Sequence, residues 1–226
     1  MALDISTFKT RALTALIFVV VMLGGLLFHP LAFRVLMALI MAGCGYEFVQ
    51  IVRLITQKTY ASLMLVIIPY IILPMVMLYD LGMHSPVSSE KYSPLLPCGI
   101  IFSIWINDTM AYIVGSLIGR TPLSKVSPKK TIEGTLGGIV LAVATITFLG
   151  TIIPSAKIIS GKEWAIISLL CAVMGTLGDL IESKLKRTAG IKDSGSILPG
   201  HGGFLDRFDS LLLAVPAVWI YVKWLM

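Results

Sequence analysis

Hydrophobic stretches long enough to cross a membrane recur along the whole chain, and they constrain its fold more than any other feature. A helix needs about 20 apolar residues to span the hydrocarbon core of a bilayer. Only 13% of the residues are charged and the mean hydropathy is +0.92, which excludes an ordinary soluble domain. The sequence therefore predicts an all-α, polytopic membrane protein. We expect seven spans, at residues 12–28, 31–55, 61–82, 95–119, 134–153, 164–181 and 208–225.

Basic residues are distributed unevenly between the predicted loops. With a cytoplasmic N-terminus, thirteen Lys and Arg residues lie inside and four outside, with Arg34 unassigned. This is the asymmetry that the positive-inside rule expects. It also accounts for the net charge of +6, so the charge gives no reason to expect a nucleic-acid partner. We expect one membrane domain over residues 1–226, with a retained first span rather than a cleaved signal peptide.

Ten of the thirty charged side chains are concentrated in residues 179–209, at the cytoplasmic ends of the last two predicted spans. No break signal comes before Gly190, so we expect the helix of the sixth span to continue to that point. One face of this helix carries, at positions i, i+3, i+4 and i+7, Asp179, Glu182, Ser183 and Lys186. Asp206 and Asp209 share another face if the last helix begins near Leu205. A solvated loop is the ordinary explanation for such a run, but this spacing could instead bring carboxylates of two neighbouring helices together.

Carboxylates near membrane depth are costly unless they are paired or bound to a metal. Oxygen ligands suit a hard divalent ion such as Mg²⁺, and the chain has no Cys/His set with zinc spacing. The sequence therefore predicts a magnesium site, with room for a second cation. The candidate ligands are Asp179, Glu182, Asp206 and Asp209.

Two segments are candidates for binding phosphate. The sequence PGHGG at 199–203 lets the backbone approach a ligand closely, because glycine has no side chain to obstruct it. It is not a P-loop, and a simple tight turn would also explain it. In the preceding cytoplasmic loop, Ser127-Pro128 predicts a turn, Lys129 and Lys130 follow, and Thr131 opens the next helix. A helix N-terminus beside lysines is a natural anion site.

Two acidic residues lie inside predicted spans. Asp108 is a functional candidate because it lies in the membrane, and a hydrogen bond with Asn107 or Thr109 is the equal structural alternative. Glu47 could meet a lysine of the site, although we expect it to serve helix packing. Gly115 and Gly119 have the small-xxx-small spacing of helix packing.

The polar segment closely resembles the signature of phosphatidate cytidylyltransferases, also called CDP-diacylglycerol synthases. The match has no gaps over Ser183-Lys184-Leu185-Lys186-Arg187, then Lys192-Asp193-Ser194-Gly195, then Leu198-Pro199-Gly200-His201-Gly202-Gly203-Phe204-Leu205-Asp206-Arg207-Phe208-Asp209. The similarity extends back through GDLIES, SPKKTIEG and WINDTMAYIVGSLIG, so the family motifs lie in residues 91–226. Nearer the N-terminus, only the pair Glu47-Phe48 matches besides the apolar spans. The chain also has fewer spans between Glu47 and Asp108 than members of the family usually carry.

The resemblance implies a reaction in which CTP and phosphatidic acid give CDP-diacylglycerol and pyrophosphate, with Mg²⁺ required. It further implies a homodimer in the bacterial inner membrane, with its site facing the cytoplasm. The residues expected to act in catalysis are Asp206, Asp209, Asp179, Lys186 and Arg187. Those expected to bind substrate are Ser127, Lys129, Lys130, Thr131, Ser183, Lys192, Asp193, His201, Gly202, Gly203, Arg207 and Asp108.

Two other functions stay open at this point. A CTP-dependent lipid kinase of the polyprenol or phytol type would also place an aspartate-rich membrane site beside a nucleotide. An ion-coupled transporter would use membrane charges near the midplane. The charges of this chain gather at one face instead, which favours an enzyme at the membrane interface.

Overall fold

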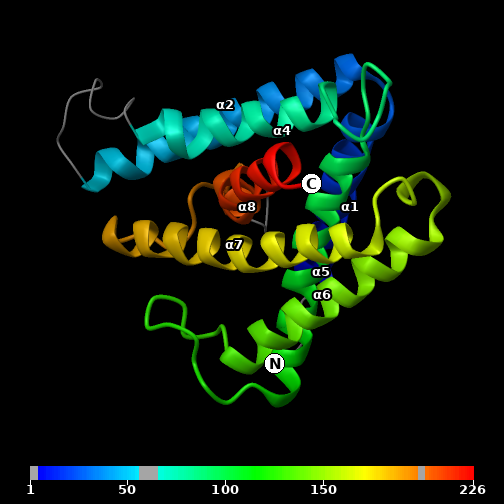
Figure 1. Cartoon of the computed structure of the whole chain (residues 1–226). Helices are drawn as coiled ribbons and strands as arrows, with labels where there is room; N and C mark the ends of the chain where they lie inside the picture. Colours follow the sequence, from blue (N-terminus) through cyan, green and yellow to red (C-terminus); the bar gives the residue numbers. More distant parts are fainter. Residues whose placement is uncertain (1–4, 56–65, 198–201) are drawn as a thin grey trace. The chain divides into compact units, whose positions relative to one another are not determined.

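The computed structural model describes residues 5–55, 66–197 and 202–226, and their regular structure is helical, which confirms the all-α prediction. The longer helices are α1 (Ile5–Leu27), α2 (Pro30–Ile55), α4 (Leu73–Met83), α5 (Leu95–Ile118), α6 (Ile132–Ile152), α7 (Gly161–Thr188) and α8 (Leu205–Trp224). Two short elements complete the order, the π-helix η1 (Ile68–Ile72) and the 3₁₀-helix η2 (Pro154–Ala156) (Figure 1).

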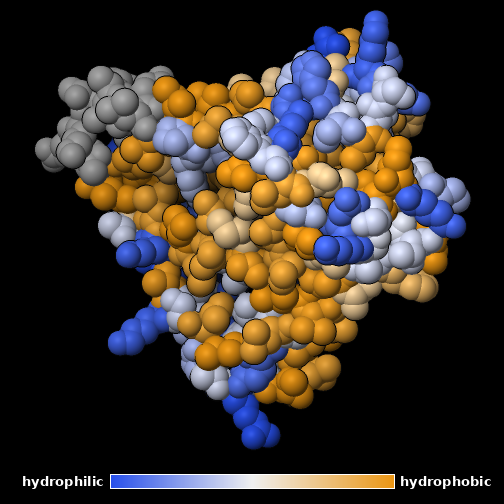
Figure 2. All heavy atoms as spheres, in the orientation of Figure 1, coloured by the Kyte–Doolittle hydropathy of each residue, from blue (hydrophilic) through white to orange (hydrophobic). Residues whose placement is uncertain are grey.

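Four of the described helices, α2, α5, α6 and α7, are long and apolar enough to cross a bilayer. Shorter apolar helices cover Ala12–Leu27 and Ile68–Met83. Large hydrophobic side chains lie exposed along these elements, and hydrophobic atoms cover much of the face that Figure 2 shows. Exposed apolar side chains are stable only in contact with lipid or protein, so the chain is a polytopic membrane protein. The count of seven spans and the cytoplasmic N-terminus stay predictions.

The third predicted span contains a local departure from α-helical geometry at Ile68–Ile72. Pro69 lies in η1, and Pro74 lies in the first turn of α4. A proline has no N–H to donate and its ring crowds the preceding turn, so the backbone widens into a π-type turn beside it. The part of this span before residue 66 lies outside the described residues.

The helices belong to two compact units, which we describe separately. The first unit contains Met1–Ile72 and Leu185–Phe208. Within it α1 and α2 run in different directions and contact each other (Figure 1). Phe204 covers Gly43 of α2 so closely that a Cβ atom there would lie 2.8 Å from its ring. The ring of Phe208 lies 5.9 Å from that of Phe18 in α1, so aromatic packing seats the segment before α8 in this unit.

The second unit contains Leu73–Lys184 and Asp209–Met226. Within it α5 and α6 contact each other through small residues (Figure 1). A Cβ atom on Gly138 would lie 2.7 Å from that of Ala111, and one on Gly115 would lie 2.9 Å from Thr131 Oγ1. Glycine at these positions lets the two backbones approach, which confirms the packing role expected for Gly115.

The helix α8 is fixed to α4 near its C-terminus. Asp80 of α4 accepts a hydrogen bond of 2.8 Å from Trp219 Nε1, and it forms an ion pair with Lys223 Nζ at 2.9 Å. Lys223 Nζ also donates to the carbonyl of His84 at 3.0 Å. These contacts hold the end of α8 that lies farthest from the aspartates of its first turns.

Candidate active site

The C-terminus of α7 has a glycine cap that ends the helix where the signature segment begins. Gly190 has a φ of 72°, in the left-handed region that favours glycine. The N–H of Ile191 donates to the carbonyl of Lys186 at 3.0 Å, and the N–H of Gly190 donates to that of Arg187 at 3.1 Å. This pair of bonds is the Schellman motif. The helix therefore continues to Thr188, as the sequence predicts.

Asp206 lies in the first turn of α8, which begins at Leu205 as predicted. Lys186 Nζ donates to its Oδ1 at 2.5 Å, while the N–H groups of Ser194 and Gly203 donate to its Oδ2 at 2.9 and 2.8 Å. Lys186 is itself buried. Three donors thus occupy most of the four lone-pair positions of this carboxylate.

These donors also determine the charge of the Asp206 side chain. Asp206 precedes the predicted span at 208–225. Burial acts to raise its pKa, but the Lys186 ammonium and the two N–H groups outweigh burial and hold the pKa below its usual value. The side chain is therefore an anion at neutral pH. An anionic Asp206 fixed by backbone N–H groups keeps one orientation relative to the start of α8.

Gly202 adopts a φ of 80°, the second left-handed glycine of this segment. A Cβ atom at this position would lie 2.6 Å from Asp206 Oδ2. Position 202 therefore requires glycine for two reasons, its left-handed backbone conformation and the lack of space for a side chain. His201, just before it, lies outside the described residues, so its role in substrate binding stays a prediction.

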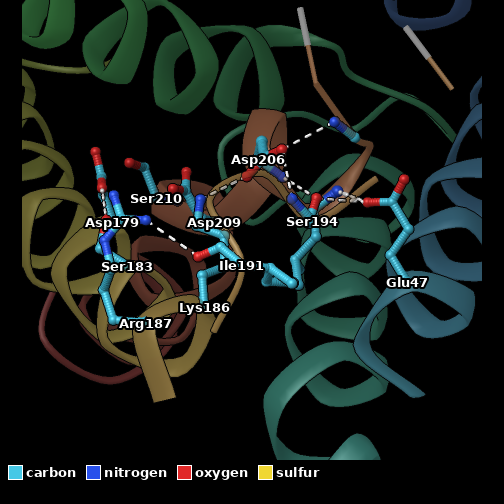
Figure 3. Close-up of polar contacts among 12 residues, drawn as sticks. Glu47, Asp179, Ser183, Lys186, Arg187, Ile191, Ser194, Asp206, Asp209 and Ser210 are labelled. Atoms are coloured by element: carbon cyan, nitrogen blue, oxygen red, sulfur yellow. Dashed lines mark hydrogen bonds and ion pairs between the residues drawn. The ribbon is translucent and has the colours of Figure 1, made fainter. Parts of the chain in front are cut away.

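Ser194 connects Asp206 to a buried glutamate of α2. Its hydroxyl accepts the N–H of Asp206 at 3.2 Å and donates to Glu47 Oε2 at 2.7 Å. The N–H of Leu205 also donates to Glu47 Oε2, at 2.9 Å. Figure 3 shows Ser194 between Glu47 and Asp206. The sequence pattern favoured a helix-packing role for Glu47 and did not mark Ser194 as a site residue, so both were missed as polar partners of the site.

In the second unit, Lys130 forms an ion pair and hydrogen bond with Asp179 of α7. Ser183, one turn along α7, donates to the other oxygen of Asp179 at 3.2 Å. Both partners of the ion pair remain partly exposed, at 31% and 24% of their side-chain surface. The predicted cationic loop and the predicted acidic helix face therefore do meet, and they stay open to solvent.

The loop that carries Lys130 is held by its own hydrogen bonds. The N–H of Lys130 donates to the carbonyl of Ser127 at 3.1 Å, which confirms the turn predicted from Ser127-Pro128. Thr131 caps α6 by accepting the N–H of Gly134 at 3.1 Å. Glu133 accepts the N–H of Thr121 at 3.2 Å and thereby ties the start of the loop to its end. Lys130 is thus presented by an ordered turn at the N-terminus of α6.

A carboxylate cluster lies where α7 passes α8 in the second unit. A Cβ atom on Gly178 would lie 2.6 Å from the carbonyl oxygen of Asp209, so the two backbones are nearly in contact there. Glu182 is fully buried and Asp209 is 8% exposed. Asp209 lies within electrostatic range of both Asp179 and Glu182. Three of the four predicted metal ligands therefore belong to this unit, on α7 and in the first turns of α8.

These oxygen donors fit the chemistry of Mg²⁺, which prefers carboxylates. Among the residues that the structure describes, no group of three or more His, Cys, Asp or Glu side chains is arranged so that it could hold a metal ion. Mg²⁺ usually binds through one or two carboxylates and takes its other ligands from water and substrate phosphates. The four candidates therefore stay predicted ligands, and Asp206 differs from the others in its full set of nitrogen donors.

Several predicted substrate-binding residues lie at exposed positions. The exposed residues are Lys129, Lys192, Asp193 and Arg207. A side chain that binds a soluble nucleotide has to be accessible, and these side chains are. Arg187 Nη1 donates to the carbonyl of Ile191 at 3.0 Å and so belongs to the α7 cap. Their part in binding CTP or lipid stays a prediction.

Asp108 has the local hydrogen bond that formed the structural alternative. Asn107 Nδ2 donates to its Oδ1 at 3.3 Å, and the Asp108 side chain is exposed. This hydrogen bond supports the structural alternative, in which Asp108 is paired with Asn107. Its predicted contact with substrate stays a prediction.

The fold defines a helical membrane protein in which each unit contains a paired charge, Lys186 with Asp206 in the first unit and Lys130 with Asp179 in the second. The sequence profile of the family described as Cytidylyltransferase family matches residues 57–225, more than half of the chain. The chain belongs to this family.

Curated relatives are named phosphatidate cytidylyltransferase. One from Synechocystis sp. is 38% identical over 161 residues, which cover 65% of this chain and 53% of the relative. One from Helicobacter pylori is 42% identical over 134 residues, covering 56% and 49%. One from Bacillus subtilis is 50% identical over 116 residues, covering 50% and 42%. The chain thus spans about half the length of the curated relatives it matches.

Proposed function

We propose that this protein transfers the cytidylyl group of CTP to phosphatidic acid, which yields CDP-diacylglycerol and pyrophosphate. The observation that carries the proposal is the match to the Cytidylyltransferase family, because it includes the whole polar segment at 179–209. The names of the curated relatives support the same substrates. The polar clusters supply the charges that this reaction needs.

The chemistry requires no nucleophilic side chain. An oxygen of the lipid phosphate attacks the α-phosphorus of CTP, and the bond between that phosphorus and the bridging oxygen to the β-phosphate breaks. The electron pair leaves with pyrophosphate. Both reactants are polyanions, so the main barrier is the repulsion between them, and cations placed beforehand lower it. This is why a Ser/His/Asp or Cys/His arrangement is not expected.

Different residues of the chain would bind the phosphate groups and hold Asp206 in place. Lys129 and Lys130, on the ordered turn before α6, would bind phosphate groups together with the N-terminus of that helix. Lys186 holds Asp206 in place, and Arg187 lies beside it at the end of α7. The backbone at Gly202 and Gly203 would approach the nucleotide, because no side chain obstructs it there.

A divalent cation fits this site by the chemistry of its donors. Asp179, Glu182, Asp206 and Asp209 would hold Mg²⁺, which when bound would neutralise charge on the leaving pyrophosphate. The site would lie at the cytoplasmic face of a bacterial inner membrane, in a homodimer. The positive-inside distribution of basic residues supports that orientation.

Purified protein in detergent, given labelled CTP, phosphatidic acid and Mg²⁺, tests the proposal. With a label on the α-phosphate, the lipid product becomes labelled, whereas a label on the γ-phosphate appears only in pyrophosphate. The opposite pattern, with γ-label in the lipid and an alcohol such as a polyprenol as acceptor, would identify a lipid kinase. No labelled lipid in either case, with the protein folded, would contradict the proposal.

A further inference from the structure

Glu47 is a carboxylate buried in an apolar helix, and neither the metal site nor the phosphate contacts account for it. It is 1% exposed and its neighbours on the buried face of α2 are Cys44, Phe48 and Ile51. Burying a carboxyl group without hydrogen bonds is expensive. A residue kept at that cost needs partners strong enough to offset it.

The partners of Glu47 all come from the signature segment. Its Oε2 accepts the hydroxyl of Ser194 at 2.7 Å and the N–H of Leu205 at 2.9 Å. Its Oε1 is buried and accepts no hydrogen bond from any residue that the structure describes. Within the described residues, the hydrogen bonding of Glu47 is therefore directed at one place, where the chain enters α8.

The bonds of Glu47 replace a conventional helix cap. The first N–H groups of a helix have no partner within the helix. At α8 the N–H of Leu205 goes to Glu47, and that of Asp206 goes to the Ser194 hydroxyl, which donates onward to Glu47. A side chain from α2 thus fixes the first turn of a helix that begins more than a hundred residues later in the chain.

Two glycines of the segment leave room for this contact. A Cβ atom on Gly195 would collide with Glu47 Oε1, and one on Gly203 would collide with Glu47 Oε2 and the Ser194 hydroxyl. Neither glycine has a left-handed φ, so backbone conformation does not explain them. Glycine at 195 and 203 is explained by the approach of the carboxylate.

We infer that Glu47 is a positioning residue, which orients Asp206 by holding Ser194 and the first turn of α8. It touches Asp206 only through Ser194 and the backbone, so it is not itself a catalytic residue. The inference rests on the proposed function for its effect on turnover. It also has a structural consequence that does not depend on activity.

The test compares Glu47→Gln, Glu47→Ala and Ser194→Ala with the control Gln50→Ala, which removes an exposed polar side chain from the same helix. The glutamine oxygen can accept the bonds that the carboxylate accepts, so Glu47→Gln should keep most of the activity. Glu47→Ala should lower kcat by on the order of tenfold to a hundredfold, with the KM for CTP nearly unchanged. The control should behave as wild type.

Hydrogen exchange provides the readout that is independent of activity. In Glu47→Ala the amides of Leu205 and Asp206 should exchange on the order of tenfold faster, while those of α5 and α6 stay unchanged. If wild-type protein shows no cytidylyl transfer, the proposed function fails, and exchange still tests the role of Glu47. Unchanged exchange at Leu205 would overturn the inference.

A double variant covers the case in which Glu47→Ala does not fold. Glu47→Asp shortens the side chain by one CH₂ group and should lower kcat on its own. Its loss in combination with Ser194→Ala should be close to the larger of the two single losses, because both changes act through one hydrogen-bonded chain. Losses that multiply as for independent sites would overturn the inference. The inference would also be overturned if Glu47→Gln and Ser194→Ala lowered kcat equally and both raised the KM for both substrates.

Discussion

At the scale of single residues, two aspartates of the candidate site have defined partners. Asp206 is matched to Lys186 and two backbone N–H groups, and Asp179 is matched to Lys130 and Ser183. The Lys186–Asp206 pair is the buried one of the two, and a buried charge is stable only when it is paired. A substitution that changes charge without changing shape therefore separates electrostatic roles from packing.

Asp206→Asn is the first such change. The amide oxygen can still accept the N–H groups of Ser194 and Gly203, but the negative charge opposite Lys186 is lost. We expect the rate of CDP-diacylglycerol formation to fall by on the order of a hundredfold or more, as for the loss of one electrostatic stabiliser. Initial rates over a range of Mg²⁺ concentrations measure it. Near-normal turnover with an unchanged Mg²⁺ requirement would contradict the role assigned to Asp206.

Lys130→Ala tests the cationic loop, with Lys125→Ala as its matched control in the same loop. Lys130 forms an ion pair with Asp179, whereas Lys125 is exposed. We expect Lys130→Ala to raise the KM for one substrate or to lower kcat by on the order of tenfold, because a charge-assisted contact is lost. Steady-state kinetics with CTP and with phosphatidic acid varied in turn distinguish the two effects.

The same comparison extends to Lys129, Lys186 and Arg187, with Arg120 as a second control. If all six cations gave the same small effect, the positive-inside rule would explain them fully and their assignment to phosphate would be wrong.

At the scale of elements, the site depends on how one helix ends and the next begins. The Schellman cap at Gly190 stops α7, and the turn at Gly202 leads the chain into α8. The aspartates of α8 lie in its first two turns, so any shift of this turn moves them. The glycines of the segment are therefore part of the site although they carry no functional group.

Gly202→Val leaves every charged group in place and tests this point. Valine strongly disfavours a φ of 80°, and its Cβ would lie 2.6 Å from Asp206 Oδ2. We expect CTP-dependent activity to collapse while the protein still inserts into the membrane and purifies normally. Gly45→Val is the control, because nothing lies within 4 Å of a Cβ atom there. An active Gly202→Val enzyme with ordinary CTP affinity would reduce the segment to a simple turn.

At the scale of the whole molecule, the orientation in the membrane decides which side holds the site. The positive-inside rule places the loop at 119–131 in the cytoplasm and the loop at 153–160 outside. Lys125 and Lys157 are exposed residues of these two loops. A cysteine at either position reports which side of the membrane that loop occupies.

We expect Lys125→Cys to react with a membrane-impermeant maleimide only in inside-out vesicles, and Lys157→Cys only in right-side-out vesicles. A protein that lacks Cys44, Cys98 and Cys171 provides the background. Labelling of both cysteines from the same side would show that α6 does not cross the membrane. The reverse pattern would invert the predicted topology and move the proposed site to the outer face.

The sequence alone determined the helical membrane fold, the end of α7 near Gly190, the start of α8 at Leu205 and the turn at Ser127. These features follow from local rules, because a helix in lipid makes its hydrogen bonds within itself and glycine and proline act on their own turn. Only the tertiary structure decided that Lys130 pairs with Asp179 and that Glu47 reaches Ser194. Those partners lie 49 and 147 residues apart, and a contact over such a distance depends on how helices pack, which no local pattern specifies.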